Sequence, residues 1–102
     1  MISEDELREK EVLQSALDNF GAALQKIMAI EEMSELTKAL TKNIRGRDNI
    51  DDIIDEIVDV ELMMKQLNLM FVTSPDIAKM KNARYTYKLN RLNERVENHV
   101  KG

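Results

Sequence analysis

Apolar residues recur at intervals of three and four along the whole chain and predict helices rather than strands, which would require strict alternation. Glycine, proline and capping residues divide this pattern into four segments. The predicted helices are about Glu4–Asn19, Ala22–Ile44, Ile50–Phe71 and Pro75–Val100. The expected fold class is therefore all-α, an antiparallel bundle of about four helices in a single domain that covers residues 1–102.

Local signals support these boundaries. Ser3 followed by Glu6 has the form of a capping box, in which the serine accepts an amide hydrogen bond and the glutamate returns one. Ser74 before Pro75 places a cap residue ahead of a proline at the first helical position. The connection Arg45–Asn49 contains a glycine stop signal. Because it is so short, the second and third helices should be antiparallel neighbours.

The residue that caps the third helix should be Asp48 or Asn49. This helix is the most apolar of the four, since only Asp59 and Glu61 are polar between Ile57 and Met64. We expect it to lie at the centre of the bundle, covered on several sides. The chain also has seven methionines. Four short helices cannot easily bury so much apolar surface, so we expect self-association, at least into a dimer.

Composition excludes several classes of protein. A chain of 102 residues has room for one domain with a modest core, and the absence of cysteine excludes disulfides and thiolate metal sites. A net charge of −4 argues against nucleic acid as a partner. No apolar run approaches the roughly 20 residues that cross a membrane, and the acidic N-terminus is unlike a signal peptide. We therefore expect a cytoplasmic protein with no membrane partner.

Two pairs of carboxylates interrupt the apolar sectors of the second and third helices. Glu32 and Glu35 are three residues apart, as are Glu56 and Asp59, so each pair lies on one helix face. The apolar residues of these two sectors are Leu24, Met28, Leu36 and Ala39, and Ile53, Val60, Met63 and Leu67. Carboxylates among such neighbours are costly to desolvate unless a cation joins them. The simplest cation is Mg²⁺, which prefers oxygen ligands; Mn²⁺ could replace it.

The predicted hairpin brings the two pairs together. Glu35 lies nine residues before the end of the second helix, and Glu56 lies six residues after the start of the third. At 1.5 Å per residue, these positions differ in distance from the turn by only about 4–5 Å. All four acids should therefore form one cluster.

The sequence Glu31-Glu32-x-x-Glu35, twenty intervening residues and Glu56-x-x-Asp59 resembles the signature of the MazG-like, all-α nucleoside triphosphate pyrophosphohydrolases. Gln25, Leu36 and Val60 extend the resemblance, which covers roughly Phe20–Leu67. It implies an enzyme that hydrolyses a nucleoside triphosphate between its α- and β-phosphates, giving a monophosphate and pyrophosphate. It further implies magnesium ions held by Glu32, Glu35, Glu56 and Asp59, in a homodimer or homotetramer.

Magnesium can neutralise phosphate oxygens and lower the pKa of a bound water for in-line attack. A carboxylate that is not fully used as a ligand could accept the proton of that water, and the candidates are Glu31 and Glu32. Glu31 points about 100° away from Glu32, so it is equally well interpreted as a surface acid.

The phosphate tail requires cations. Lys88 and Arg91 recur at helical spacing in the last helix, where the resemblance implies a basic residue, although such a stripe is often only solvated. Lys42, on the Glu35 side of its helix, is a further candidate, whereas Lys38 should pair with Glu35 or Glu31. Gln25 is a candidate for lining the substrate pocket. We exclude His99, near the end of the chain, as a base.

Two alternatives remain open at this stage. The signature does not separate this activity from that of a phosphoribosyl-ATP pyrophosphohydrolase. A non-catalytic helical interaction module with a vestigial metal site belongs to a different class of function, and a titration of magnesium that follows thermal stability would discriminate it in part.

Overall fold

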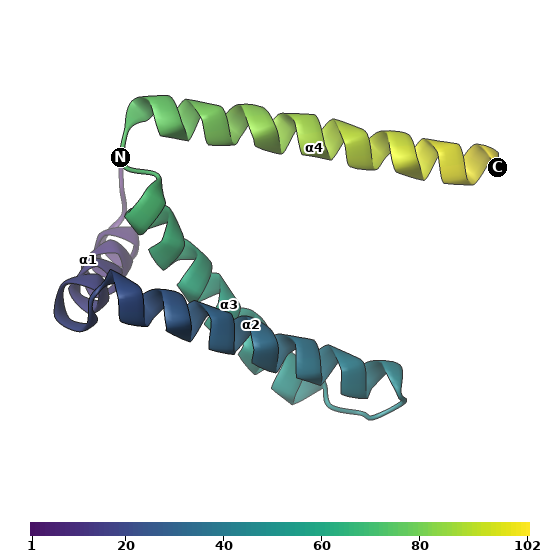
Figure 1. Ribbon diagram of the computed structural model, residues 1–102, viewed down its shortest axis with the longest axis horizontal. Helices are drawn as coiled ribbons and strands as arrows, with labels where there is room; N and C mark the ends of the chain where they lie inside the picture. Colours follow the sequence, from purple (N-terminus) through teal and green to yellow (C-terminus); the bar gives the residue numbers. More distant parts are fainter. The chain divides into compact units, whose positions relative to one another are not determined.

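The computed structural model describes residues 1–102 and contains four α-helices and no strand (Figure 1). The helices are α1 (Glu4–Phe20), α2 (Ala22–Ile44), α3 (Ile50–Phe71) and α4 (Pro75–Lys101). The predicted all-α class is confirmed, and every helix boundary lies within one residue of its predicted position. None of the four helices combines the length and apolar character needed to span a membrane.

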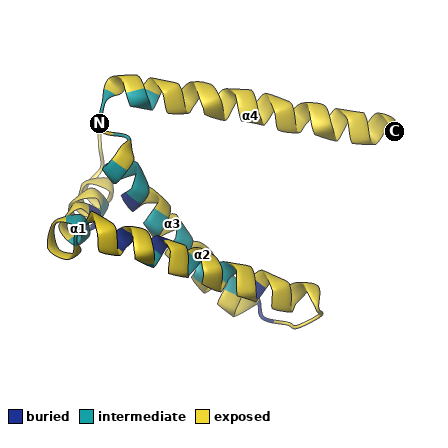
Figure 2. Cartoon of the chain, in the orientation of Figure 1, coloured by how far each residue is buried: buried dark blue, intermediate teal, exposed yellow.

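Internal contacts divide the chain into two compact units, Met1–Phe71 and Val72–Gly102. The first unit holds α1, α2 and α3, and the second consists of α4 and the three residues before it. Each unit is described by itself. The predicted single domain therefore comprises, in the structure, a three-helix unit and one further helix that has no buried residue of its own (Figure 2).

Side-chain caps begin two of the helices. The Ser3 hydroxyl accepts a hydrogen bond from the backbone N–H of Glu6 at 3.1 Å, as the capping-box pattern predicts. The Ser74 hydroxyl accepts from the N–H of Ile77 at 3.2 Å, with Pro75 at the first helical position. Between α1 and α2, Gly21 adopts φ 87°, a conformation that disfavours side-chain-bearing residues, and so permits one helix to follow another directly.

The connection between α2 and α3 is tied back to α2 by Asn49. This residue is buried, and its side-chain amide donates to the carbonyl oxygen of Ala39 at 3.0 Å. Its backbone carbonyl accepts from the N–H of Ile53 at 3.1 Å, so Asn49 also occupies the N-cap position of α3. The turn therefore fixes the register of the two antiparallel helices along their axes.

The interior of the three-helix unit is small. Its buried apolar residues are Leu13, Ala29 and Ala39, and no side chain is fully buried. Between α2 and α3, the Gln25 amide donates to the side-chain oxygen of Gln66 at 2.7 Å, and both glutamines are buried. A buried amide pair of this kind is satisfied only at one register of the two helices.

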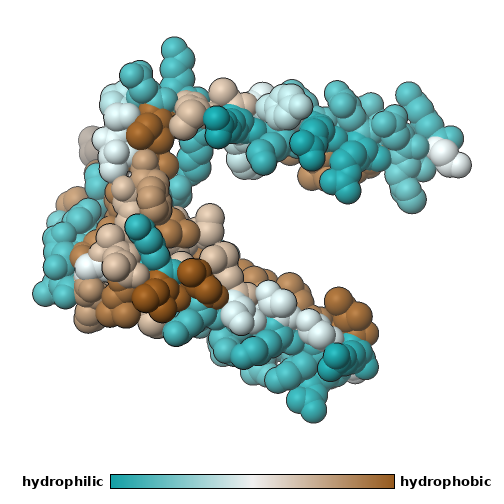
Figure 3. Space-filling view, in the orientation of Figure 1, coloured by the Kyte–Doolittle hydropathy of each residue, from teal (hydrophilic) through white to brown (hydrophobic).

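The expectation that α3 is covered on several sides is wrong for the three-helix unit. Gln66 is the only buried residue of α3, because within this unit only α1 and α2 pack against the helix. The rest of its surface carries large apolar side chains that are exposed: Ile50, Ile54, Ile57, Val58, Leu62, Met64 and Phe71. Figure 3 shows apolar side chains gathered on the surface of this unit.

Candidate metal centre

Three of the four predicted metal ligands meet between α2 and α3. Glu32 of α2 and Glu56 and Asp59 of α3 each present a carboxylate oxygen, and these oxygens lie within 4.8 Å of one another. We refer to these three residues as the acidic cluster. The predicted hairpin thus brings acids that are 24 or more residues apart in the sequence to one place.

The pattern of half-buried residues explains why Glu32 and Glu56 point inward, whereas Asp59 is exposed. On α2, Met28, Glu32 and Leu36 follow one another at intervals of four residues, and all three are half-buried. On α3, Glu56 is half-buried between Ile53 and Val60, which are also half-buried. The interleaving of acids with apolar residues therefore reflects the packed sides of both helices, as the sequence predicts.

The electrostatics of the cluster favour a cation. Burial is the main reason that the pKa of Glu32 is raised above its ordinary value of 4.5. Repulsion from Asp59 and Glu56 raises this pKa further. A hydrogen bond to Asp59 and repulsion from Glu35 add to the shift. Burial is also the main reason that the pKa of Glu56 is raised. Repulsion from Asp59 and Glu35 raises this pKa further, and Asp55 and Asp52 make smaller contributions in the same direction. Both carboxylates are thus less stable in the charged form than they are in water.

One oxygen of the cluster lacks any partner. Glu56 Oε2 is buried and has no hydrogen bond. Buried polar oxygens are normally satisfied, so an unpartnered one beside two further carboxylates fits a site that binds a ligand. Three carboxylates from two rigid helices supply the oxygen ligands that Mg²⁺ prefers. The residues present therefore fit the predicted ion.

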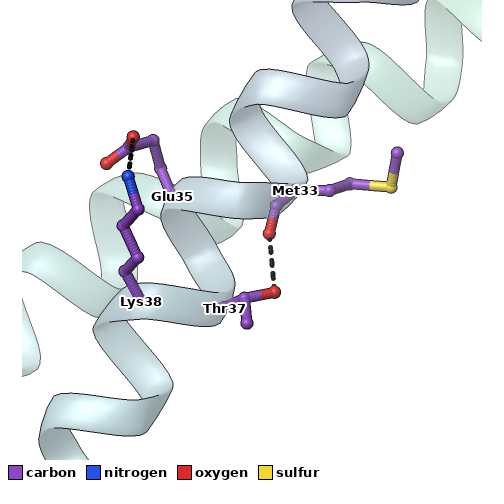
Figure 4. Close-up of polar contacts among 4 residues, drawn as sticks. All are labelled: Met33, Glu35, Thr37 and Lys38. Carbon is purple, nitrogen blue, oxygen red and sulfur yellow. Dashed lines mark hydrogen bonds and ion pairs between the residues drawn. The ribbon is translucent and has the colours of Figure 1, made fainter.

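Glu35, the fourth predicted ligand, is not part of the acidic cluster. It is exposed, and its Oε1 accepts from Lys38 Nζ at 3.2 Å, the local pairing that the sequence predicts (Figure 4). On the neighbouring turn, the Thr37 hydroxyl donates to the carbonyl oxygen of Met33 at 2.9 Å. Glu35 nevertheless contributes to the negative potential that raises the pKa of Glu32 and Glu56.

The remaining predicted residues occupy different environments. Glu31 is exposed on α2, and Lys42 is exposed near the end of the same helix. Gln25 is buried, with its amide engaged by Gln66, so its place in this chain is the helix interface. Lys88 and Arg91 are exposed residues of α4, in the second unit. Their predicted contact with substrate stays a prediction.

Sequence reasoning missed Asn49 as a link between the turn and α2. Asn43 next to the turn donates to Asn49 Oδ1 at 3.4 Å, which adds to the bond from Asn49 to Ala39. Polar residues in a turn give no sequence signal for a contact ten residues away.

Comparison of the chain with family models, curated proteins and solved structures finds no match.

Proposed function

We propose that this protein is a magnesium-dependent, MazG-like nucleoside triphosphate pyrophosphohydrolase that cleaves between the α- and β-phosphates. The observation that carries the proposal is the acidic cluster, in which two helices direct three carboxylates at one point and leave Glu56 Oε2 buried without a partner. The spacing of Glu31, Glu32, Glu35, Glu56 and Asp59, which resembles the signature of that family, supports the same assignment.

Glu32, Glu56 and Asp59 would hold the ion, because their oxygens converge. When bound, magnesium offsets the charge of the phosphates and lowers the pKa of a coordinated water. Glu35 stands beside these residues and could join them if it left its exposed ion pair with Lys38, which is worth little. Glu31, adjacent in sequence to Glu32, is the candidate for accepting a proton from the attacking water, and Glu32 is the alternative.

We also propose that the active form is a homodimer or homotetramer. Only three apolar residues of the three-helix unit are buried, whereas α2 and α3 expose many large apolar side chains. A second copy of the chain would remove this surface from water. A cytoplasmic location, where nucleoside triphosphates are plentiful, fits the activity.

The test is a panel of ribo- and deoxyribonucleoside triphosphates with Mg²⁺, in which pyrophosphate and orthophosphate are scored separately. We expect pyrophosphate, which identifies the bond that is cleaved. Glu56→Gln and Asp59→Asn should each lower turnover by about 100-fold or more, because a ligand to the ion is lost. Asp51→Asn, an exposed acid at the start of α3 outside the cluster, is the matched control and should leave turnover unchanged.

Release of orthophosphate, or equal turnover by parent and cluster variants, would contradict the proposal. Including phosphoribosyl-ATP in the panel separates the activity from its closest alternative. If no substrate turns over and Mg²⁺ still raises the melting temperature of the parent but not of Glu56→Gln, the chain is the non-catalytic module.

A further inference from the structure

A group of cations lies at the turn between α2 and α3. Lys42, Arg45 and Arg47, with Gly46, line a hollow of about 520 Å³, which we call the turn hollow. No carboxylate lines it, and none of the three cations forms an ion pair. Lys38, one turn before Lys42, is by contrast paired with Glu35. The turn hollow therefore presents three positive charges that the protein itself does not neutralise.

The backbone of the turn satisfies carbonyl oxygens at the end of α2, where the helix carries a partial negative charge. Here they accept hydrogen bonds from the turn itself, with Arg45 N–H bonded to Thr41 O at 3.2 Å and Arg47 N–H to Lys42 O at 3.1 Å. Gly46 makes this possible because it adopts φ 97°.

A smaller hollow shares one lining residue with the turn hollow and one with the acidic cluster. Its volume is about 150 Å³, and Glu35, Lys42, Asp52 and Glu56 are among its lining residues. Lys42 lines both hollows, and Glu56 belongs to the acidic cluster. Lys42 follows Glu32, the α2 residue of the acidic cluster, by ten residues, or about 15 Å along the helix axis.

The acids near the turn are collected in a different hollow. Asp48, Asp51 and Asp52 line a space of about 410 Å³ at the start of α3, where they suit the positive end of the helix dipole. Of the three cations, only Arg47 also borders this space. Asp52 also lines the smaller hollow beside Lys42, whereas Arg45 shares no hollow with an acid.

We propose that Lys42, Arg45 and Arg47 form a polyphosphate subsite that binds the terminal phosphates of the substrate. Guanidinium groups form paired hydrogen bonds to phosphate oxygens, and an ammonium group adds a point charge. The phosphate chain would then run from the acidic cluster toward the α2–α3 turn, with the nucleoside on the opposite side of the cluster. This orientation rests on the proposed function, whereas binding of a phosphate chain to the turn hollow does not.

The test uses inorganic tripolyphosphate as the probe, titrated into the full chain by calorimetry at constant ionic strength with a chelator present, so that no metal contributes. Arg45→Gln/Arg47→Gln removes two charges from the turn hollow. Arg8→Gln/Lys10→Gln removes two exposed charges from α1 and is the matched control. We expect the turn variant to weaken binding by about tenfold or more and the control by less than about twofold.

Steady-state kinetics provide a second readout. The turn variant should raise KM for a nucleoside triphosphate while kcat stays within about twofold, because a binding contact common to ground and transition states is lost. All four substituted side chains are exposed, so the helical content measured by circular dichroism should not change.

Absence of saturable tripolyphosphate binding, or equal weakening in the turn variant and the control, overturns the subsite. If the parent hydrolyses triphosphates but the turn variant binds tripolyphosphate as tightly as the parent does, the subsite fails and the proposed function stands. If binding depends on these arginines but no nucleotide is hydrolysed, the subsite stands and the proposed function fails.

Discussion

Glu56 places one carboxylate oxygen, Oε2, where neither solvent nor a hydrogen-bond donor reaches it. Glu32 and Asp59 lie beside it, and one carboxylate oxygen of each of the three residues lies within 4.8 Å of the others. Burial and the mutual repulsion of these acids raise the pKa of Glu32 and of Glu56, so both groups bind a proton more tightly in the folded protein than in water. The charge state of the cluster must therefore affect stability.

The pH dependence follows from the direction of these shifts. An acid with a raised pKa binds its proton more tightly in the folded state, so it favours folding at low pH and disfavours it as the pH rises from 4.5 through the raised pKa. We expect the melting temperature of the metal-free parent, relative to Glu32→Gln/Glu56→Gln, to fall over this interval. Melting curves from pH 4.5 upward in a chelator would measure the difference, and parallel curves would contradict the expectation.

Added Mg²⁺ provides the internal control for that experiment. An ion that binds only the folded state stabilises it by an amount that grows with the logarithm of the ion concentration, so Mg²⁺ should raise the melting temperature of the parent at neutral pH. The double glutamine variant should not respond, since it retains only Asp59 of the acidic cluster.

Much of the acidic cluster could be predicted from sequence at the scale of residues. Spacing alone put Glu32 and Glu56 among apolar neighbours, and both prove half-buried. The same reasoning grouped Glu35 with them, yet Glu35 is exposed and pairs with Lys38. A position three residues from Glu32 lies at the edge of the packed side rather than at its centre, and a periodicity of about 100° per residue does not resolve that edge.

Two polar contacts fix how α2 and α3 align at the scale of helices. Gln25 bonds to Gln66 at one end of the pair, and Asn49 bonds to the carbonyl oxygen of Ala39 at the other. A slip of either helix would leave buried polar atoms unpaired, which costs more than the hydrogen bonds contribute. Because Glu32 and Glu56 lie between these contacts, the alignment determines whether the acidic cluster can form.

The glutamine pair can be tested by removing one partner and then both. We expect Gln66→Leu to lower the free energy of unfolding by about 1–3 kcal/mol, because the buried amide of Gln25 loses its acceptor. Gln25→Leu/Gln66→Leu should recover much of that loss, since no polar group stays unpaired. Urea denaturation measures both values.

Gln14→Leu is the matched control for the glutamine pair, since Gln14 is an exposed glutamine of α1. It should change the free energy of unfolding by less than about 0.5 kcal/mol. A double variant that is less stable than Gln66→Leu alone would show that the pair does not act as a unit.

At the scale of the whole molecule, little apolar surface is buried. Leu13, Ala29 and Ala39 are the only buried apolar residues, and α4 has no buried residue. Helix stability in proteins comes mainly from burial of an apolar face. α3 exposes several large apolar side chains, among them Ile54 and Val58.

Self-association can be tested on that surface. Ile54 and Val58 are 54% and 48% exposed and lie one turn apart on α3. We expect the parent to sediment as a dimer or larger species, and Val58→Lys to shift it toward the monomer because a charge would be buried in the interface. Gln14→Lys adds the same charge to an exposed position of α1 and should not. A monomeric parent would contradict the expectation.

The sequence by itself determined the four helices and the inward direction of Glu32 and Glu56. These features depend on local spacing, capping residues and turn chemistry, all of which act within a few residues. Only the tertiary structure decided that Glu35 stays outside the acidic cluster, that Glu56 Oε2 lacks a partner, and that the cations of the turn line one hollow. These depend on how two helices align and where side chains end, which periodicity does not specify.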